Sequence, residues 1–171
     1  WFELVVSRDQ HQLVGVVSDF TIRKDRELAL QYQATHDELT GALNRRGLQN
    51  CIHTILQKRT ASFTFFCLEI KQFTTLIGAY VVSVSDQFLS SFFTELFRYM
   101  NTQGEVARLH VDQFVVLVNQ NETLAAEETF NLFLERVAAA PFLLEGRSIQ
   151  VSVLATIVVQ GMVDNVLDVM D

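Results

Sequence analysis

Two carboxylates are the side chains of this sequence best suited to chemistry. Glu69 stands at the end of a Phe-rich apolar run, and Asp112 lies in a polar turn between two apolar runs. Carboxylate oxygens are preferred ligands of Mg²⁺. Because the runs next to Glu69 and Asp112 are typical of neighbouring strands, we expect these two carboxylates to lie close together. They are weak candidates for a divalent-ion site.

The turn that carries Asp112 limits what such a site can do. Its residues are His110, Val111, Asp112 and Gln113, and Phe114 follows. Gln113 is neutral, so it cannot act as a charged ligand or as a base. His110 could join a metal beside Asp112, but a lone histidine in a turn is more often solvated, and we expect it in solvent.

Hydrophobic patterning predicts the elements that position these carboxylates. The continuous apolar run over Ser62–Ile70 is typical of a buried central strand. Two short apolar runs on either side of the turn predict a hairpin over Glu105–Val118. The other predicted elements are helices over Lys71–Tyr80, Ser85–Tyr99 and Thr123–Ala139 (capped by Thr123), a hairpin of Phe142–Leu144 with Ser148–Val159, and a last short helix from Asp164. Their order indicates helices packed on a mostly antiparallel sheet.

The first part of the chain has a different pattern. Strand-like runs at Trp1–Val6 and Leu13–Val17 predict a terminal hairpin, which we assign to a preceding and mostly missing domain. A helix is predicted over Arg23–Thr35, either paired with its twin in a dimer or lying alone as a linker. After a turn at Asp37–Gly41, Asn44 is expected to cap a helix that runs to about Lys58.

Composition restricts the function classes. The chain has 171 residues, 49% of them hydrophobic, and a formal net charge of −7, which argues against binding to nucleic-acid phosphates. Its two cysteines, Cys51 and Cys67, do not form a disulfide framework and are expected to be buried thiols. No apolar run is long enough to cross a membrane and no signal peptide opens the chain. We expect a cytoplasmic fragment of a longer protein, which could be membrane-anchored elsewhere.

A specific motif connects this sequence to a known family. The string Asp37-Glu38-Leu39-Thr40-Gly41-Ala42-Leu43-Asn44-Arg45-Arg46 resembles the opening motif of GGDEF domains, the diguanylate cyclases. The stretch Ser18–Lys24 is similar to the junction between a PAS sensor and such a domain. The resemblance extends over Asp19–Asp171. It implies an α+β fold with a palm-like, ferredoxin-related, mostly antiparallel sheet covered by helices.

Active members of this family join two GTP molecules into cyclic di-GMP, with divalent metal at the triphosphate. The resemblance places the family's signature turn on His110–Phe114 and its first metal ligand on Glu69, with Lys71 nearby. Asp112 would keep a metal-binding carboxylate. His110 and Val111 replace glycines and would crowd the nucleotide. No residue of the turn is therefore expected to be catalytic.

The resemblance also locates nucleotide-binding positions, which we regard as vestigial. Asp86 matches a guanine-binding Asp, whereas Ile77 replaces a guanine-reading Asn, and Arg108 precedes the signature turn. Loss of a polar partner of this kind costs about 1 to 3 kcal/mol, so base selectivity is expected to be weak. The product-inhibition motif falls on Asn101–Gly104 and is absent. The basic residues that the family uses at the triphosphate belong to a helix beyond Asp171.

Together these observations predict three segments: the end of a PAS-like domain (residues 1–18), a signalling linker helix (19–36) and a degenerate GGDEF domain (37–171). The expected function is an inactive regulatory or dimerisation module that couples a PAS-type sensor to an output such as a cyclic di-GMP phosphodiesterase (EAL) domain. No cofactor is required in this interpretation. The alternatives are a switch that binds GTP with Mg²⁺ weakly but does not turn it over, and an active cyclase with an atypical site. Expected partners are cyclic di-GMP signalling components and a second copy through the linker helix, but neither nucleic acid nor membrane.

Overall fold

The computed structural model describes residues 2–9, 12–19, 21–57, 62–79 and 82–159, and side chains from residue 21 onward except those of four residues, Leu76, Ile77, Ala79 and Gln120. Residues 1–34 and 35–171 form two compact units. The domain boundaries predicted at residues 18 and 36 stay predictions. The last helix predicted from Asp164 lies outside the described residues.

The smaller unit contains the predicted hairpin and helix. Strands β1 (Phe2–Asp9) and β2 (Gln12–Asp19) pair in antiparallel register. Helix α1 (Thr21–Thr35) begins two residues before the prediction and has no buried residue.

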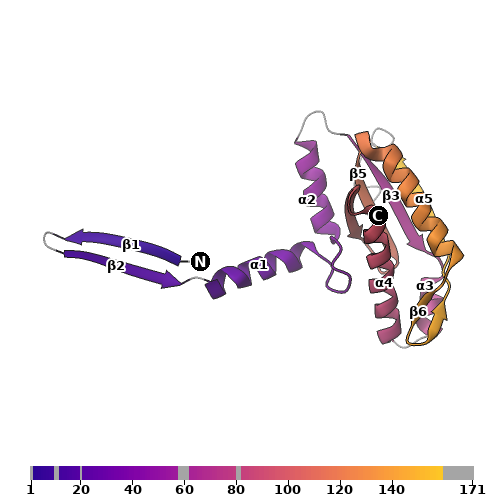
Figure 1. The fold of residues 1–171 in the computed structure, drawn as a ribbon, viewed down its shortest axis with the longest axis horizontal. Helices are drawn as coiled ribbons and strands as arrows, with labels where there is room; N and C mark the ends of the chain where they lie inside the picture. The colour runs from indigo at the N-terminus through magenta and orange to yellow at the C-terminus, as the bar shows by residue number, and fades with distance from the viewer. Residues whose placement is uncertain (1, 10–11, 20, 58–61, 80–81, 160–171) are drawn as a thin grey trace. The chain divides into compact units, whose positions relative to one another are not determined.

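The larger unit is built on a four-stranded antiparallel sheet in the order β4-β5-β3-β8. The four strands are β3 (Phe63–Ile70), β4 (Gly104–Arg108), β5 (Gln113–Asn119) and β8 (Val153–Val159). As predicted, β3 is central, and both of its faces are largely buried because helices cover the sheet on both sides (Figure 1). The predicted α+β fold is confirmed.

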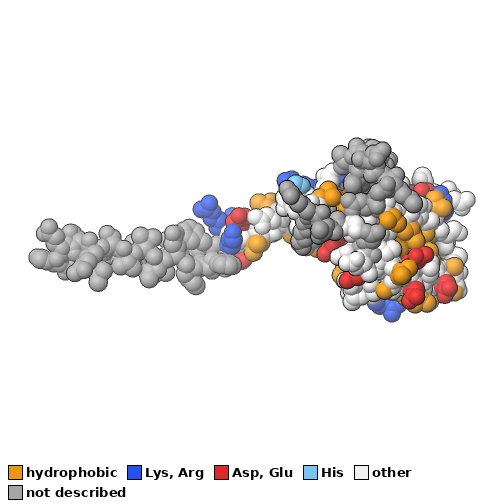
Figure 2. Space-filling view, turned by 90° about the horizontal axis from the view of Figure 1, so that it is seen from above, with side chains coloured by type: hydrophobic (Ala, Val, Ile, Leu, Met, Phe, Trp, Pro, Cys, Tyr) orange, Lys and Arg blue, Asp and Glu red, His pale blue; other side chains and the backbone are white. Residues whose placement is uncertain are grey.

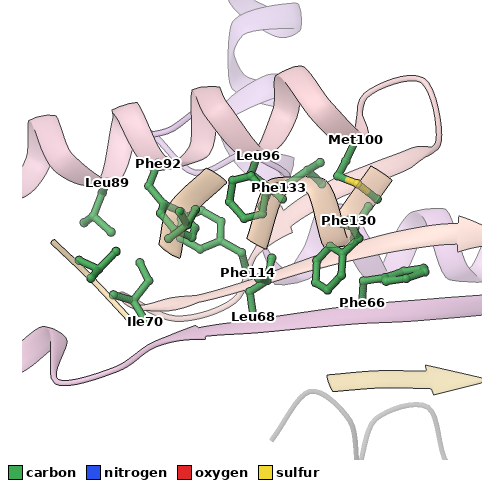
Figure 3. Packing of buried hydrophobic residues seen from close by; sticks show 14 of the residues in the cluster. Phe66, Leu68, Ile70, Leu89, Phe92, Leu96, Met100, Phe114, Phe130 and Phe133 are labelled. Carbon is green, nitrogen blue, oxygen red and sulfur yellow. The ribbon is translucent and has the colours of Figure 1, made fainter. Parts of the chain in front are cut away.

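Helices α4 (Val82–Met100) and α5 (Thr123–Ala139) cover one face of the sheet, and α2 (Arg45–Leu56) covers the other (Figure 1). The first face carries a cluster of aromatic rings in which Phe92 contacts Phe114, Phe133 and Phe142 at centroid distances of 5.3 to 5.9 Å (Figure 3). On the second face, Leu48 and Ile52 of α2 join the smaller cluster that contains Phe63 and Phe65. Burial of this aromatic area is the main favourable term for the fold.

Three element predictions needed correction. Residues 148–159 do not form one strand: β6 (Phe142–Leu144) pairs with β7 (Arg147–Ile149), and β8 crosses to pair with β3. Periodicity identifies a strand but not its partner. Thr123 does not cap α5; its hydroxyl lies 2.9 Å from that of Thr64, and Glu122 precedes the helix without a side-chain cap.

The third correction concerns the segment over Lys71–Tyr80. Helix α3 (Phe73–Ala79) begins only after a turn in which Gln72 has a φ of 56°. The short 3-10 helix η1 (Gln120–Glu122) completes the larger unit. No helix in the described part of the chain is long and apolar enough to span a membrane.

Candidate nucleotide-binding site

The signature turn lies against the end of the central strand, as the sequence predicted. The amide of Ile70 donates to the carbonyl of Asp112 at 2.9 Å, and Glu69 is paired with Gln113 across the β3-β5 ladder. The turn itself is closed by a 3.0 Å hydrogen bond from the amide of Leu109 to the carbonyl of Gln113. The backbone thus brings the Glu69 and Asp112 positions to the same end of neighbouring strands.

The positively charged side chain of Lys71 lies beside Glu69 at this end of the strands. The ammonium of Lys71 is 2.9 Å from a carboxylate oxygen of Glu69, and both side chains are partly exposed. No group of three or more His, Cys, Asp and Glu side chains in the described ranges could hold a metal ion. Lys71 thus neutralises one of the two carboxylates that lie at this end of the strands.

Two side chains occupy the positions of the turn where the resemblance implies glycine. Val111 is 55% exposed, and His110 is exposed as predicted. An Nη2 of Arg45, at the start of α2, lies 3.3 Å from Nε2 of His110. The turn thus presents a β-branched side chain and an imidazole to solvent.

Arg108 proves to connect two motifs. Its side chain is only 8% exposed; Nη1 donates to Asp37 at 2.9 Å, and Nη2 donates to the carbonyl of Val111 at 2.9 Å. Its guanidinium also lies 6.0 Å from the ring centre of Phe114. Its Nε is buried without a partner in the described structure. Arg108 therefore ties the opening motif to the signature turn, a role that sequence reasoning missed because the two residues are 71 positions apart.

Asp37 is the other half of this connection. Its carboxylate also accepts hydrogen bonds from the amide and the hydroxyl of Thr40, at 2.9 and 2.7 Å. Burial alone would raise the pKa of Asp37, but the bonds from Thr40 and Arg108 outweigh it and hold that pKa below its ordinary value of 3.8. Asp37 is therefore ionised near neutral pH.

Asn44 organises the start of the larger unit. Its side-chain oxygen accepts from the amide of Gly47 at 2.9 Å, which confirms the predicted cap, and its side-chain amide donates to the carbonyl of His36. Its backbone amide donates to the carbonyl of Thr35 at 2.9 Å. A Cβ on Gly47 would lie 2.2 Å from that carbonyl oxygen, so only glycine allows this close approach.

The opening motif also extends the sheet. Leu43 donates to the carbonyl of Val106 and accepts from the amide of Arg108, at 3.0 and 2.8 Å, so it forms a parallel bridge beside β4. The motif that carries the family resemblance thus has a structural role within the larger unit: it extends the edge of the sheet next to the signature turn.

The remaining predicted positions are not brought to one place by any described contact. Asp86 lies half-buried on α4, and the side chain of Ile77 on α3 is outside the described set. In the segment Asn101–Gly104, the first three residues form a turn between α4 and β4 that backbone hydrogen bonds from Asn101 and Gln103 hold, and Gly104 begins β4. Both cysteines are free and half-buried rather than fully buried, and burial raises the pKa of each thiol.

Comparison with known proteins identifies the family. A profile of the family described as "Diguanylate cyclase, GGDEF domain" matches residues 34–168. The chain belongs to the GGDEF family. A curated relative, uncharacterized protein y4lL of Sinorhizobium fredii (strain NBRC 101917 / NGR234), is 27% identical over 169 residues, which cover 91% of this chain and 20% of the relative. The chain thus spans about a fifth of that relative's length.

Solved structures agree with this assignment at the level of the fold. The GGDEF domain of FimX from Pseudomonas aeruginosa has a TM-score of 0.71 and 19% identity, over 80% of this chain and 86% of that domain. The diguanylate cyclase SiaD from the same organism, crystallised with its activator SiaC, has a TM-score of 0.70 and 16% identity, over 86% of this chain and 57% of SiaD. DgcB from Caulobacter crescentus, in complex with c-di-GMP, has a TM-score of 0.67 and 14% identity, over 80% and 74% of the two chains. At these identities the GGDEF chain shares the fold with them.

Proposed function

We propose that this GGDEF domain makes no cyclic di-GMP and works as a regulatory module, relaying the state of a preceding PAS-type sensor to an output such as an EAL domain. The observation that carries the proposal is the 2.9 Å ion pair between Lys71 and Glu69. Lys71 compensates the charge of a carboxylate that a metal ion would need. A divalent ion would either have to displace that lysine to reach Glu69 or rely on Asp112 alone.

The signature turn supports the same proposal. The fourth residue of the turn is Gln113, which is neutral. Val111 projects a branched side chain at a position where a nucleotide can approach the backbone closely only if there is no side chain. At the same time the opening motif keeps its contacts: Asn44 bonds to Thr35 and His36, and Asp37 pairs with Arg108, which also bonds to the turn. These contacts support a regulatory role for a domain that has lost groups that the reaction needs.

The proposed partners follow from this role. The solved SiaD structure is a complex with an activator protein, and that relative shows that a protein of this family can bind a protein regulator. For the present chain we propose protein domains rather than nucleotide as the main ligands.

The test is a turnover assay on the full-length protein. We expect no cyclic di-GMP by liquid chromatography after incubation with GTP and Mg²⁺, with SiaD as the active control. Calorimetric titration of GTP with Mg²⁺ distinguishes the alternative of a GTP-binding switch: we expect no heat of binding at millimolar nucleotide. Formation of cyclic di-GMP would overturn the proposal, and saturable GTP binding without turnover would replace it by the switch.

A further inference from the structure

The outward face of α5 has no function in the site described above. Its two leucines, Leu124 and Leu132, are 79% and 57% exposed, and Glu128 stands exposed midway between them. Glu135 continues the same face nearly one turn beyond Leu132 and is exposed as well. The glutamates at 128 and 135 have no ion-pair partner among the described residues, and the one arginine of α5, Arg136, donates instead to the carbonyl of Ala140.

Helix α1 carries a row of the same form with the opposite charge. Ile22 and Leu30 are 71% and 66% exposed, and the exposed Arg26 lies midway between them. Arg26 has no ion-pair partner in the part of the chain that the structure describes, whereas Lys24 is paired with Glu27 at 2.9 Å. Figure 2 shows basic and hydrophobic side chains together on the described part of this helix.

The two rows match in spacing. Ile22, Arg26 and Leu30 follow one another at four-residue intervals, and so do Leu124, Glu128 and Leu132. Residues at four-residue intervals form the surface ridges that interdigitate in the commonest class of helix packing in globular proteins. When the two helices pack with these ridges aligned, parallel or antiparallel, Arg26 lies opposite Glu128 in the middle. An isoleucine or leucine of one helix then lies opposite a leucine of the other at each end of the ridge.

We propose that α1 of one copy of this chain packs on α5 of a second copy, with Arg26 facing Glu128 of the partner copy, and that the exchange is reciprocal in a two-fold dimer. This goes beyond the proposed regulatory function and names a contact between two copies of the chain. Charge complementarity selects these faces: α5 against α5 would oppose glutamates, and α1 against α1 through this row would oppose arginines. A two-fold axis repeats each contact, so the complementary ridge pair is formed twice.

The experiment measures the dimer dissociation constant by sedimentation equilibrium for the chain and for charge-reversal variants. Arg26→Glu alone and Glu128→Arg alone are each expected to weaken the dimer roughly tenfold or more, because two attractive contacts become repulsive. The matched control is Glu38→Arg, which reverses an exposed glutamate with no described partner outside both rows. This control is expected to leave the dissociation constant unchanged.

An equimolar mixture of the two single variants is the decisive sample. In a reciprocal dimer of one copy of each variant, both contacts again join a glutamate to an arginine, so association is expected to return to within about threefold of the original. Circular dichroism of each variant checks that the fold is retained. The turnover assay tests the proposed function separately, and its interpretation does not depend on these results.

Three results would overturn the proposal. A chain that stays monomeric at the highest soluble concentration has no such interface. A dimer weakened by Arg26→Glu but not by Glu128→Arg would be held through α1 alone. A mixture that fails to recover, while the double variant Arg26→Glu/Glu128→Arg does, would place the contact within one chain. None of these results bears on whether the domain is catalytically inactive.

Discussion

Replacing Arg108 by methionine tests the link between the opening motif and the signature turn. The substitution keeps much of the apolar stem but removes the 2.9 Å bonds to Asp37 and to the carbonyl of Val111. A hydrogen bond to a charged group contributes about 1.5 to 3 kcal/mol, and breaking a partly buried pair leaves the other charge poorly compensated. Asp37 keeps its two bonds from Thr40, and the unpartnered Nε of Arg108 is removed as well. We therefore expect a loss of about 2 to 3 kcal/mol in the free energy of unfolding.

The assay is urea denaturation followed by circular dichroism, with Arg98→Met as the matched control. Arg98 is also paired at 2.9 Å, with Glu95, but on the exposed surface of α4, so its replacement is expected to change stability much less. Equal losses of unfolding free energy in Arg108→Met and Arg98→Met would refute the reasoning, because the buried ion pair would then contribute no more than the exposed one.

The contribution of the Asp37–Arg108 pair to stability is expected to depend on pH. The folded-state pKa of Asp37 is below its unfolded value of 3.8, so its contribution is fully present above that value and is lost as pH falls through the lower, folded-state pKa. The difference in stability between the original chain and the Asp37→Asn variant should therefore shrink as pH is lowered below about 4. A difference that stays constant from neutral pH down to acid unfolding would contradict the assigned ionisation.

Two further predictions concern the joint at the end of α1. Gly47→Ala is expected to cost about 1 to 3 kcal/mol of unfolding free energy, because its Cβ would meet the carbonyl of Thr35, whereas Gly78→Ala, with nothing within 4 Å, should be neutral or stabilising by the same urea titration. Asn44→Ala is expected to cost about 1 to 2 kcal/mol, and Asn44→Asp less, since aspartate keeps the cap on Gly47 and loses only the bond to His36. An aspartate variant as unstable as the alanine one would show that the bond to His36, not the cap, carries the effect.

The sequence alone determined the fold class and most of the elements. The apolar run at β3, the amphipathic pattern of α4 and the span of α5 each reflect local periodicity, which does not depend on distant residues. The cap at Asn44 was predictable for the same reason, because its partner is only three residues away. The sequence led us to expect Glu69 near Asp112 on neighbouring strands, and the pairing of β3 with β5 confirms that expectation.

Only the tertiary structure decided which residues meet across long separations. The partner of β8 is β3 rather than β6, and the partner of Arg108 is Asp37, because pairing over such distances is chosen by the packing of the whole core and leaves no periodic signal. The pairing of Lys71 with Glu69, two residues apart, was also undetermined in the sequence, since β-strand periodicity does not say which way a side chain turns after the strand ends. The sequence therefore determined the scaffold and its candidate carboxylates, and the folded chain decided that one of those carboxylates is paired with lysine and that a buried arginine joins the opening motif to the turn.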